Sequence, residues 1–163
     1  MLLYVYEGEL AVVIGKTGYR IAKEDAMEYV AGYSVANDYA IRDYLENYYR
    51  PNLRVKNRDA CTPLGPWLVT RDEIADPMTL ALTTRVNGKT TQQGTTADMI
   101  FDIPTLIAYL SSFMTLNPGD VILTGTPEGL ADVKAGDVVE TEVENVCCLV
   151  NTIVDDQTWF ATV

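Results

Sequence analysis

The stretch Tyr6-Glu7-Gly8-Glu9-Leu10 decides how this 163-residue chain folds and what chemistry it can carry. It sets two carboxylates inside an apolar run, residues 2–14, which predicts a β-strand that Gly15 ends. Because side chains two residues apart on a strand share a face, Glu7 and Glu9 would project together from this apolar element. Unpaired anions are costly there, and a divalent cation is the simplest compensation. A solvent-facing strand edge is the commoner explanation of an isolated Glu-x-Glu pattern.

A third carboxylate, Asp38, follows Asn37 at the end of a second predicted strand, residues 33–38. Arg42 comes four residues later, about one helical turn along the chain. Alone, Asp38 is better explained by a helix cap or a strand-end turn in which it accepts backbone hydrogen bonds. With the two glutamates it would complete a set of hard oxygen ligands. Three such ligands suffice for magnesium or manganese, because magnesium in particular keeps several waters.

The rest of the chain predicts many short strands and about three helices, which is the pattern of a mainly β, α+β domain with a mixed sheet. Asn87-Gly88 signals a hairpin. Asp102 can cap a helix with Pro104 in its first turn. The apolar side chains at helical spacing in that helix should belong to the core: Leu106, Ile107, Leu110, Phe113 and Met114. The other predicted elements are helices 23–30 and 42–49 and strands 80–86, 89–93, 121–126, 138–143 and 147–154.

Composition fits a single domain over residues 1–163 and excludes several classes of protein. Apolar residues make up 48% of the chain, which excludes disorder, and the net charge of −11 argues against nucleic acid as a partner. The longest apolar runs are too short to span a bilayer, and no basic segment begins a secretory signal. Three cysteines and no histidine form neither a disulfide framework nor a good zinc set, so we expect a cytoplasmic protein.

Several spaced motifs between Tyr6 and Asp155 resemble the fumarylacetoacetate hydrolase family. The motifs are residues 32–51 around Ala36-Asn37-Asp38-Tyr39, then Arg54-Val55-Lys56-Asn57-Arg58-Asp59, Gln93-Gly94-Thr95-Thr96-Ala97-Asp98, Leu116-Asn117-Pro118-Gly119-Asp120 and Leu123-Thr124-Gly125-Thr126-Pro127-Glu128-Gly129-Leu130. The resemblance implies a rolled β-sandwich of the family's C-terminal type. The strand pattern is consistent with that fold but does not predict it unaided.

The resemblance also implies roles for individual residues. Matched residue by residue, the ligands of magnesium or manganese would be Glu7, Glu9 and Asp38. Arg42 and Lys56 would be catalytic and would also bind substrate. The remaining substrate-binding residues would be Thr126, Gln93 and Gly94.

Two of these assignments have plainer explanations. Lys56 lies between Arg54 and Arg58 and could be one member of a solvated basic stretch. Thr126 lies in a glycine–proline turn, although loops at strand ends often carry binding groups. Arg42 differs from a lysine in that its guanidinium can grip a carboxylate with two parallel hydrogen bonds, which suits an acidic protein that must bind a dianion.

The function that the resemblance implies is metal-dependent decarboxylation and isomerisation of unsaturated 2-oxo and 2-hydroxy dicarboxylates in homoprotocatechuate (4-hydroxyphenylacetate) catabolism. Leu45 stands where several hydrolase relatives hold glutamine, which argues against simple acylpyruvate hydrolysis. Two alternatives remain open. One is oxaloacetate decarboxylase or acylpyruvate hydrolase activity, and the other is a catalytically silent, metal-binding half of a larger assembly.

The chain departs from the family pattern at its start. Family members normally carry a segment with a histidine and a glutamate before the Glu-x-Glu strand, whereas this chain begins six residues before Glu7 and has no histidine. We therefore expect an N-terminally truncated domain, in which isomerisation is more exposed to the loss than decarboxylation. We also expect either a homo-oligomer, a dimer or trimer, or a companion chain that supplies the missing segment.

Overall fold

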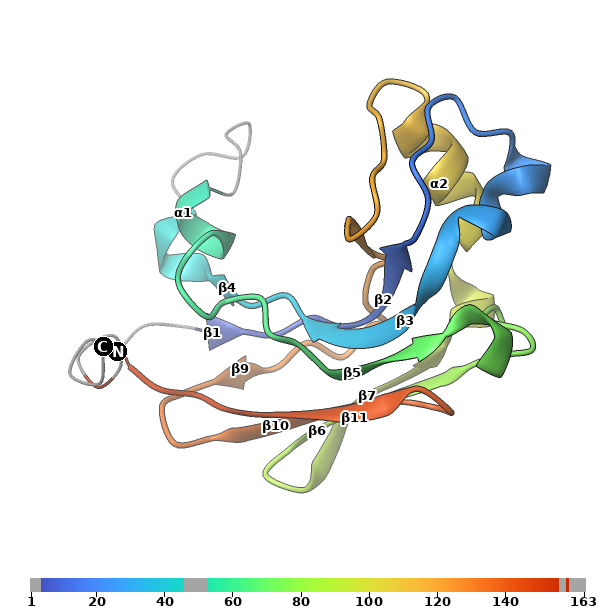
Figure 1. The fold of residues 1–163 in the computed structure, drawn as a ribbon. Coiled ribbons are helices and arrows are strands. Elements are labelled where there is room, and N and C mark those ends of the chain that lie inside the picture. The colour runs from blue at the N-terminus through green and yellow to red at the C-terminus, as the bar shows by residue number, and fades with distance from the viewer. Residues whose placement is uncertain (1–3, 46–52, 156–157, 159–163) are drawn as a thin grey trace.

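The computed structural model describes residues 4–45, 53–155 and 158, and its architecture is two packed β-sheets with a smaller third sheet (Figure 1). The apolar run predicted as one strand is two, β1 (Tyr4–Val5) and β2 (Gly8–Ile14). The two strands separate because their neighbours differ. β1 pairs with β4 (Ala40–Ile41) and β9 (Asp132–Val133), whereas β2 lies inside a larger sheet.

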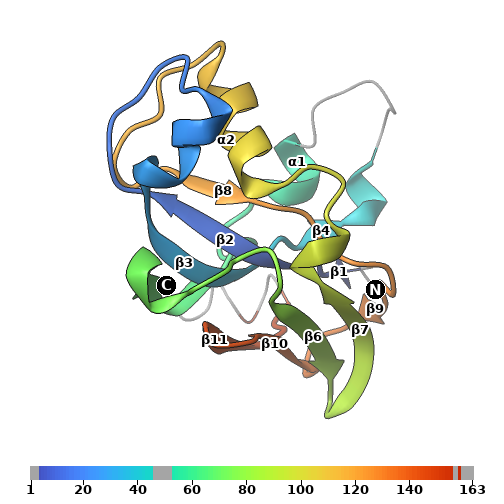
Figure 2. The ribbon, with the colours of Figure 1, turned by 90° about the vertical axis from the view of Figure 1, so that its right-hand side faces the viewer.

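The larger sheets form the two layers seen edge-on in Figure 2, with helix α2 (Ile103–Ser111) beyond the upper layer. The upper sheet has the order β5-β3-β2-β8, with β3 at Val30–Asn37, β5 at Leu64–Thr70 and β8 at Val121–Leu123. The lower sheet has the order β11-β10-β6-β7, with β6 at Ala81–Val86, β7 at Lys89–Thr95, β10 at Val138–Val143 and β11 at Cys147–Thr152. The predicted mainly β sandwich is therefore confirmed.

The predicted mixed sheet needs correction, because every pair among the described strands runs antiparallel. The hairpin of β6 and β7 shows the physical reason. Asn87 and Gly88 both adopt positive φ angles, 50° and 78°, which suit the tight turn of a two-residue hairpin. Short turns of this kind join antiparallel neighbours, whereas parallel strands need long crossovers.

Most of the described helices are short and of the 3₁₀ type. They are η1 (Lys23–Tyr29), η2 (Arg42–Tyr44), η3 (Arg71–Glu73) and η4 (Thr96–Asp98), and the four-residue α1 spans Leu53–Lys56. The predicted helix 42–49 is seen only as η2, since residues 46–52 lie outside the described ones. Within the described part of the chain, no helix has the length and apolar character needed to cross a membrane.

Helix α2 begins at the predicted cap. Asp102 accepts a hydrogen bond from the Thr105 amide at 2.8 Å and forms an ion pair with Lys23, also at 2.8 Å. The predicted core face is only partly right. Ile107 is buried and Leu106 and Leu110 pack against the core, but Phe113 and Met114 are exposed. Their exposure follows from the end of the helix at Ser111, which takes them off the buried stripe.

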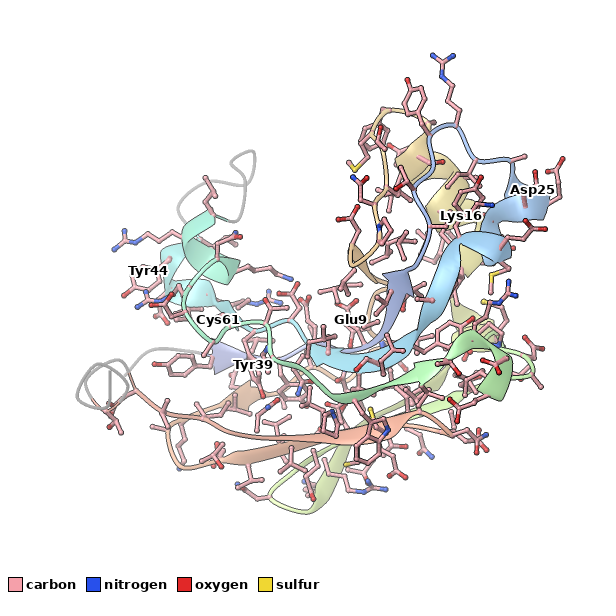
Figure 3. The ribbon with its side chains drawn as sticks, viewed as in Figure 1. Glu9, Lys16, Asp25, Tyr39, Tyr44 and Cys61 are labelled. Carbon is pink, nitrogen blue, oxygen red and sulfur yellow. The ribbon has the colours of Figure 1, made fainter. Side chains whose placement is uncertain are left out.

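The main core lies between the two sheets and continues to η1 and α2, which contribute Ala26, Ile103 and Ile107. On β2 the even-numbered side chains Leu10, Val12 and Ile14 belong to this core, so the odd-numbered Glu9 and Ala11 face the opposite side of the upper sheet. Figure 3 shows Glu9 between two raised parts of the molecule. One carries Tyr44 of η2, and the other carries Lys16 and, in η1, Asp25.

Candidate metal centre

Three carboxylates converge on the outer face of the upper sheet. Glu7 lies in the break between β1 and β2, Glu9 lies in β2, and Asp38 directly follows β3. One oxygen from each side chain lies within 4.8 Å of the other two. The sequence predicts this convergence from a single strand that carries Glu7 and Glu9 on one face, but Glu7 is not in a strand. The three carboxylates come together because β2 pairs with β3: Gly8 opposes Asn37, and the Asp38 amide donates to the Glu7 carbonyl at 2.9 Å.

Gly8, between the two glutamates, lets β2 approach the lower sheet closely. A Cβ at this position would lie 2.5 Å from Oγ1 of Thr84 and 2.8 Å from Cγ2 of Thr141. Thr141 in turn donates to Oδ1 of Asn37 at 2.7 Å, and these three polar side chains are fully buried. Through these buried contacts the lower sheet supports Gly8, which lies between Glu7 and Glu9, and Asn37, which precedes Asp38.

Glu9 is a buried acid, with only 4% of its surface exposed. Burial raises its pKa from 4.5 to about 7, against the lowering effect of the Gly125 amide, and the charges of Asp38 and Glu7 raise it further. That amide donates to Oε2 of Glu9 at 2.5 Å. An anionic Glu9 therefore needs more positive charge than the backbone around it supplies.

Lys56 lies at this site, as predicted. Its ammonium donates to Oε2 of Glu7 at 2.6 Å and to Oδ2 of Asp38 at 2.5 Å. Desolvation lowers the pKa of Lys56, but the hydrogen bonds to Asp38 and Glu7 outweigh it and hold the pKa above its ordinary value. Lys56 is therefore a cation and a hydrogen-bond donor at neutral pH, and the reading of Lys56 as part of a purely solvated basic stretch does not describe its contacts.

The donor set fits a hard divalent cation. All three side chains offer carboxylate oxygens, and the ammonium of Lys56 already forms ion pairs with those of Glu7 and Asp38. Each oxygen bound to Mg²⁺ lies about 2.1 Å from the ion, so ligands of one ion lie within roughly 4.2 Å of each other. The observed separations need little side-chain movement to meet that condition. The absence of histidine from the chain makes zinc a poor match.

A loop with residues 124–127 passes over Glu9. Besides the Gly125 amide, Thr124 binds the Leu10 carbonyl through its hydroxyl at 2.9 Å, so the loop is attached to β2 at two adjacent residues. Thr126 follows at once and is therefore held near Glu9, as its predicted role requires. Its hydroxyl accepts a hydrogen bond from the side-chain amide of Gln92 at 2.9 Å.

Gln92 is the residue of this region that the sequence does not single out. It is buried, and Gly94 on the same face of β7 packs against the loop, since a Cβ on Gly94 would lie 2.8 Å from Cβ of Pro127. The predicted Gln93 has the opposite orientation: its side chain is exposed on the other face of β7. The two-residue period of a strand is the signal that separates Gln92 from Gln93.

Arg42 opens η2 and is exposed. Helix α1, which carries Lys56, packs against η2 and β4, so the two predicted cationic residues come from neighbouring elements. The ammonium of Lys56 lies against the carboxylates. Arg42 is exposed at the edge of this region.

Comparison with known proteins agrees with this geometry. The family model described as Fumarylacetoacetate (FAA) hydrolase C-terminal matches residues 3–154. The 4-hydroxyphenylacetate degradation bifunctional isomerase/decarboxylase of Salmonella dublin is 63% identical over 152 residues, which are 93% of this chain. The chain spans only 35% of that relative's length.

Two solved structures are similar over most of the chain. The 5-carboxymethyl-2-hydroxymuconate delta-isomerase of Mycobacterium smegmatis has a TM-score of 0.88 and 41% identity, covering 93% of this chain and 59% of the other. The maleylpyruvate hydrolase of Sphingobium sp. SYK-6, in complex with manganese (II) ion and pyruvate, has a TM-score of 0.85 and 37% identity, covering 94% and 55% respectively.

Proposed function

Because the chain belongs to the fumarylacetoacetate hydrolase family, we propose that it is a magnesium- or manganese-dependent decarboxylase and isomerase of unsaturated 2-oxo and 2-hydroxy dicarboxylates. The pathway would be homoprotocatechuate (4-hydroxyphenylacetate) breakdown. The observation that carries the proposal is the convergence of Glu7, Glu9 and Asp38 against Lys56 in a domain 63% identical to part of a bifunctional isomerase/decarboxylase.

Glu7, Glu9 and Asp38 would hold the ion. When bound, the ion supplies Lewis-acid stabilisation of negative charge that develops on a substrate oxygen. Three ionised carboxylates carry one negative charge more than a divalent ion neutralises, and the ammonium of Lys56 balances that remaining charge. An anionic substrate therefore meets a site that is not repulsive, although the chain as a whole has a net charge of −11.

The proposed reactions share one electronic requirement. Loss of carbon dioxide breaks a carbon–carbon bond and leaves its electron pair in the conjugated chain. Isomerisation instead breaks a carbon–hydrogen bond, and a base takes the proton while the electron pair stays in the conjugated chain. In both cases the negative charge spreads to the 2-oxo oxygen. Lys56, which stays protonated, would donate a hydrogen bond to that oxygen as its charge grows. Proton transfer to and from carbon needs a further acid or base.

Substrate orientation would come from hydrogen-bond donors around the carboxylates. Thr126 would donate its hydroxyl proton to a substrate carboxylate, and Gly94 of β7 would let the adjacent Pro127 pack closely against that strand. The exposed Arg42 would bind the distal carboxylate of a dicarboxylate with its two parallel N–H groups. These assignments rest on the matched family motif and on the positions of the carrying elements.

A second candidate is acylpyruvate hydrolysis or oxaloacetate decarboxylation. The similar maleylpyruvate hydrolase structure, with its manganese and pyruvate, favours this candidate because pyruvate shares the 2-oxo acid group. A catalytically silent, metal-binding half is the third. The three make different predictions about turnover, so a single set of assays separates them.

The test measures carbon dioxide release from 5-carboxymethyl-2-oxohex-3-ene-1,6-dioate and isomerisation of 2-hydroxyhepta-2,4-diene-1,7-dioate by the purified chain with Mn²⁺. Oxaloacetate and an acylpyruvate are assayed separately as alternative substrates. We expect these two pathway substrates to give the highest kcat/KM, and chelation to abolish turnover. Faster turnover of oxaloacetate or acylpyruvate would favour the second candidate. No turnover with manganese bound would establish the silent half.

The setting of the domain is part of the proposal. The three cysteines are free, which suits a cytoplasmic enzyme.

The side chains of Leu64, Trp67 and Leu68 are exposed along β5, an edge strand of the upper sheet. Such an edge suits either a homo-oligomer, a dimer or trimer, or a companion segment that covers it. Light scattering of the purified chain tests this, since a monomer at all concentrations would remove the homo-oligomer.

A further inference from the structure

Gln92 is a buried polar residue whose two side-chain hydrogen bonds both go to the loop over the metal centre. Its side chain is 1% exposed, and its Nε2 atom donates to Oγ1 of Thr126 at 2.9 Å and to the Pro127 carbonyl at 2.7 Å. Both of the amide's N–H groups are therefore used on consecutive residues of the loop. A glutamine that served only to fill space would have no need of two partners on one loop.

The contact with Pro127 fixes which way the amide points. A carbonyl oxygen can only accept hydrogen bonds, so the nitrogen of the Gln92 amide must face Pro127, and the opposite flip would place two acceptors 2.7 Å apart. The same nitrogen then also faces Thr126. The hydroxyl of Thr126 consequently accepts from Gln92, and its own proton is directed to a different acceptor.

The position of the Thr126 hydroxyl follows from how the loop is attached. The residue before Thr126, Gly125, donates its amide to the carboxylate of Glu9 at 2.5 Å. Gly94, on the same face of β7 as Gln92, packs against Pro127 after it. Thr126 is therefore held from both sides, and among the described residues its hydroxyl has Gln92 as its only hydrogen-bond partner.

We propose that Gln92 is a positioning residue that makes Thr126 an obligate hydrogen-bond donor toward the carboxylate of a 2-oxo acid bound beside Glu9. This inference rests on the proposed function, because it assumes that such an acid binds there. It assigns the positioning role to Gln92, whereas the matched family motif points to the neighbouring Gln93. Gln92 itself need not touch the ligand.

The substitution Gln92→Glu tests the inference because it keeps the size of the side chain and replaces both N–H donors with an acceptor. The Thr126 hydroxyl would then turn to donate to the introduced carboxylate and would no longer donate to the ligand. We expect the Kd for pyruvate, measured calorimetrically with saturating Mn²⁺, to rise about tenfold, the usual effect of losing one hydrogen bond to a charged group. The affinity for Mn²⁺ alone should change far less.

Three further variants make the result specific. Gln93→Glu introduces the same charge on the exposed face of β7, and if Gln93 rather than Gln92 supports the ligand, it will be the more harmful substitution. Thr90→Glu adds the charge at an exposed position of β7 and controls for the net charge. Gln92→Met, which removes the hydrogen bonds without adding an acceptor, should weaken pyruvate binding less than Gln92→Glu, and it replaces that variant if the buried charge prevents folding.

The role through Thr126 is tested by combining substitutions. Thr126→Val should weaken pyruvate binding on its own, and Gln92→Glu should then add little to the loss. Full additivity of the two, or wild-type pyruvate affinity in both Gln92 variants, overturns the inference and leaves the proposed function standing. If the wild-type protein binds Mn²⁺ but no pyruvate, the proposed function itself fails and the role of Gln92 falls with it.

Discussion

The ammonium nitrogen of Lys56 lies 2.5 Å from Oδ2 of Asp38, so α1 is joined to the end of β3 at the centre of the site. The same nitrogen reaches Glu7, and both carboxylates are mostly shielded from solvent, with 16% and 19% of their side-chain surfaces exposed. Lys56 therefore has two consequences. It stabilises the carboxylate cluster when no ion is bound, and it supplies a donor to whatever ligand the ion holds.

Replacing Lys56 with methionine separates these two effects. In metal-free protein, Glu7 and Asp38 lose their shared cation, and we expect the free energy of unfolding to fall by about 2 kcal/mol, the cost of losing hydrogen bonds to charged groups. Saturating Mn²⁺ should recover most of this stability, because the ion replaces the ammonium. Catalytic turnover should not recover. Urea unfolding with and without Mn²⁺ measures the effect, and Lys89→Met, at an exposed position, is the control.

The opposite outcome is equally clear. If Lys56→Met and Lys89→Met destabilise the metal-free protein to the same extent, the ion pairs of Lys56 contribute nothing to folding.

The raised pKa of Glu9 predicts a pH dependence of stability. Between its ordinary pKa of 4.5 and its folded-state pKa of about 7, the folded protein holds the proton that the unfolded chain has lost. The contribution of Glu9 is thus fully present below 4.5 and is lost as the pH rises through 7. From these values we expect metal-free wild type to lose about 3 kcal/mol of stability relative to Glu9→Gln across this range.

The measurement is urea unfolding of metal-free wild type and Glu9→Gln at several pH values. The difference between the two proteins isolates Glu9 from the other carboxylates that titrate. Parallel stability curves for the two proteins would show that Glu9 has an ordinary pKa and is better solvated than its burial indicates.

Gly8 should not tolerate a side chain. In Gly8→Ala the new Cβ would meet Oγ1 of Thr84 and Cγ2 of Thr141, so β2 must move away from the lower sheet and carry both glutamates with it. We expect a loss of about 1–3 kcal/mol of stability, as for other overpacked sites, together with weaker Mn²⁺ binding. The control is the double variant Gly8→Ala, Thr84→Ala, which removes the nearest clash and should regain part of both losses relative to Thr84→Ala. Unchanged metal affinity in Gly8→Ala would mean that the sheet contact does not position the carboxylates.

Arg42 should affect substrate binding more than the chemical step. Arg42→Lys keeps the charge but loses the two parallel N–H groups, so we expect KM for a dicarboxylate to rise about tenfold with a smaller change in kcat. KM for pyruvate-like monocarboxylates should change less, because they lack the distal group. Steady-state kinetics of both substrate classes measure this, with Arg20→Lys on the exposed loop as control. Equal effects on the two classes would remove the distal carboxylate as the partner of Arg42.

Local chemistry made part of the fold predictable from sequence. Asn87-Gly88 predicts its hairpin because both residues tolerate positive φ, and Asp102 predicts its helix start because its side chain satisfies a free amide. The end of that helix was less predictable. Phe113 continues the apolar period in sequence, but it lies beyond Ser111 and instead packs edge-on against Tyr109, with 5.5 Å between ring centroids.

The candidate site was predictable in its residues and less so in its geometry. The types and motif positions of Glu7, Glu9 and Asp38 indicated a metal site, but their convergence depends on the long-range register between β2 and β3. Gln92 was missed for the same reason. Adjacent glutamines look alike in sequence, and only the pairing of β7 with β6, with its irregularity between Thr84 and Arg85, shows which one is buried.

A calorimetric titration of the metal-free chain with Mn²⁺ tests the central claim most directly. The account predicts saturable binding of a single ion in the wild type, and an affinity at least about tenfold lower in Glu9→Gln, because one ligand charge is lost. Glu28→Gln, which makes the same charge change at an exposed position of η1, should bind as the wild type does. Equal Mn²⁺ affinity in Glu9→Gln and Glu28→Gln, or no saturable binding in the wild type, would contradict the metal centre on which the proposed function depends.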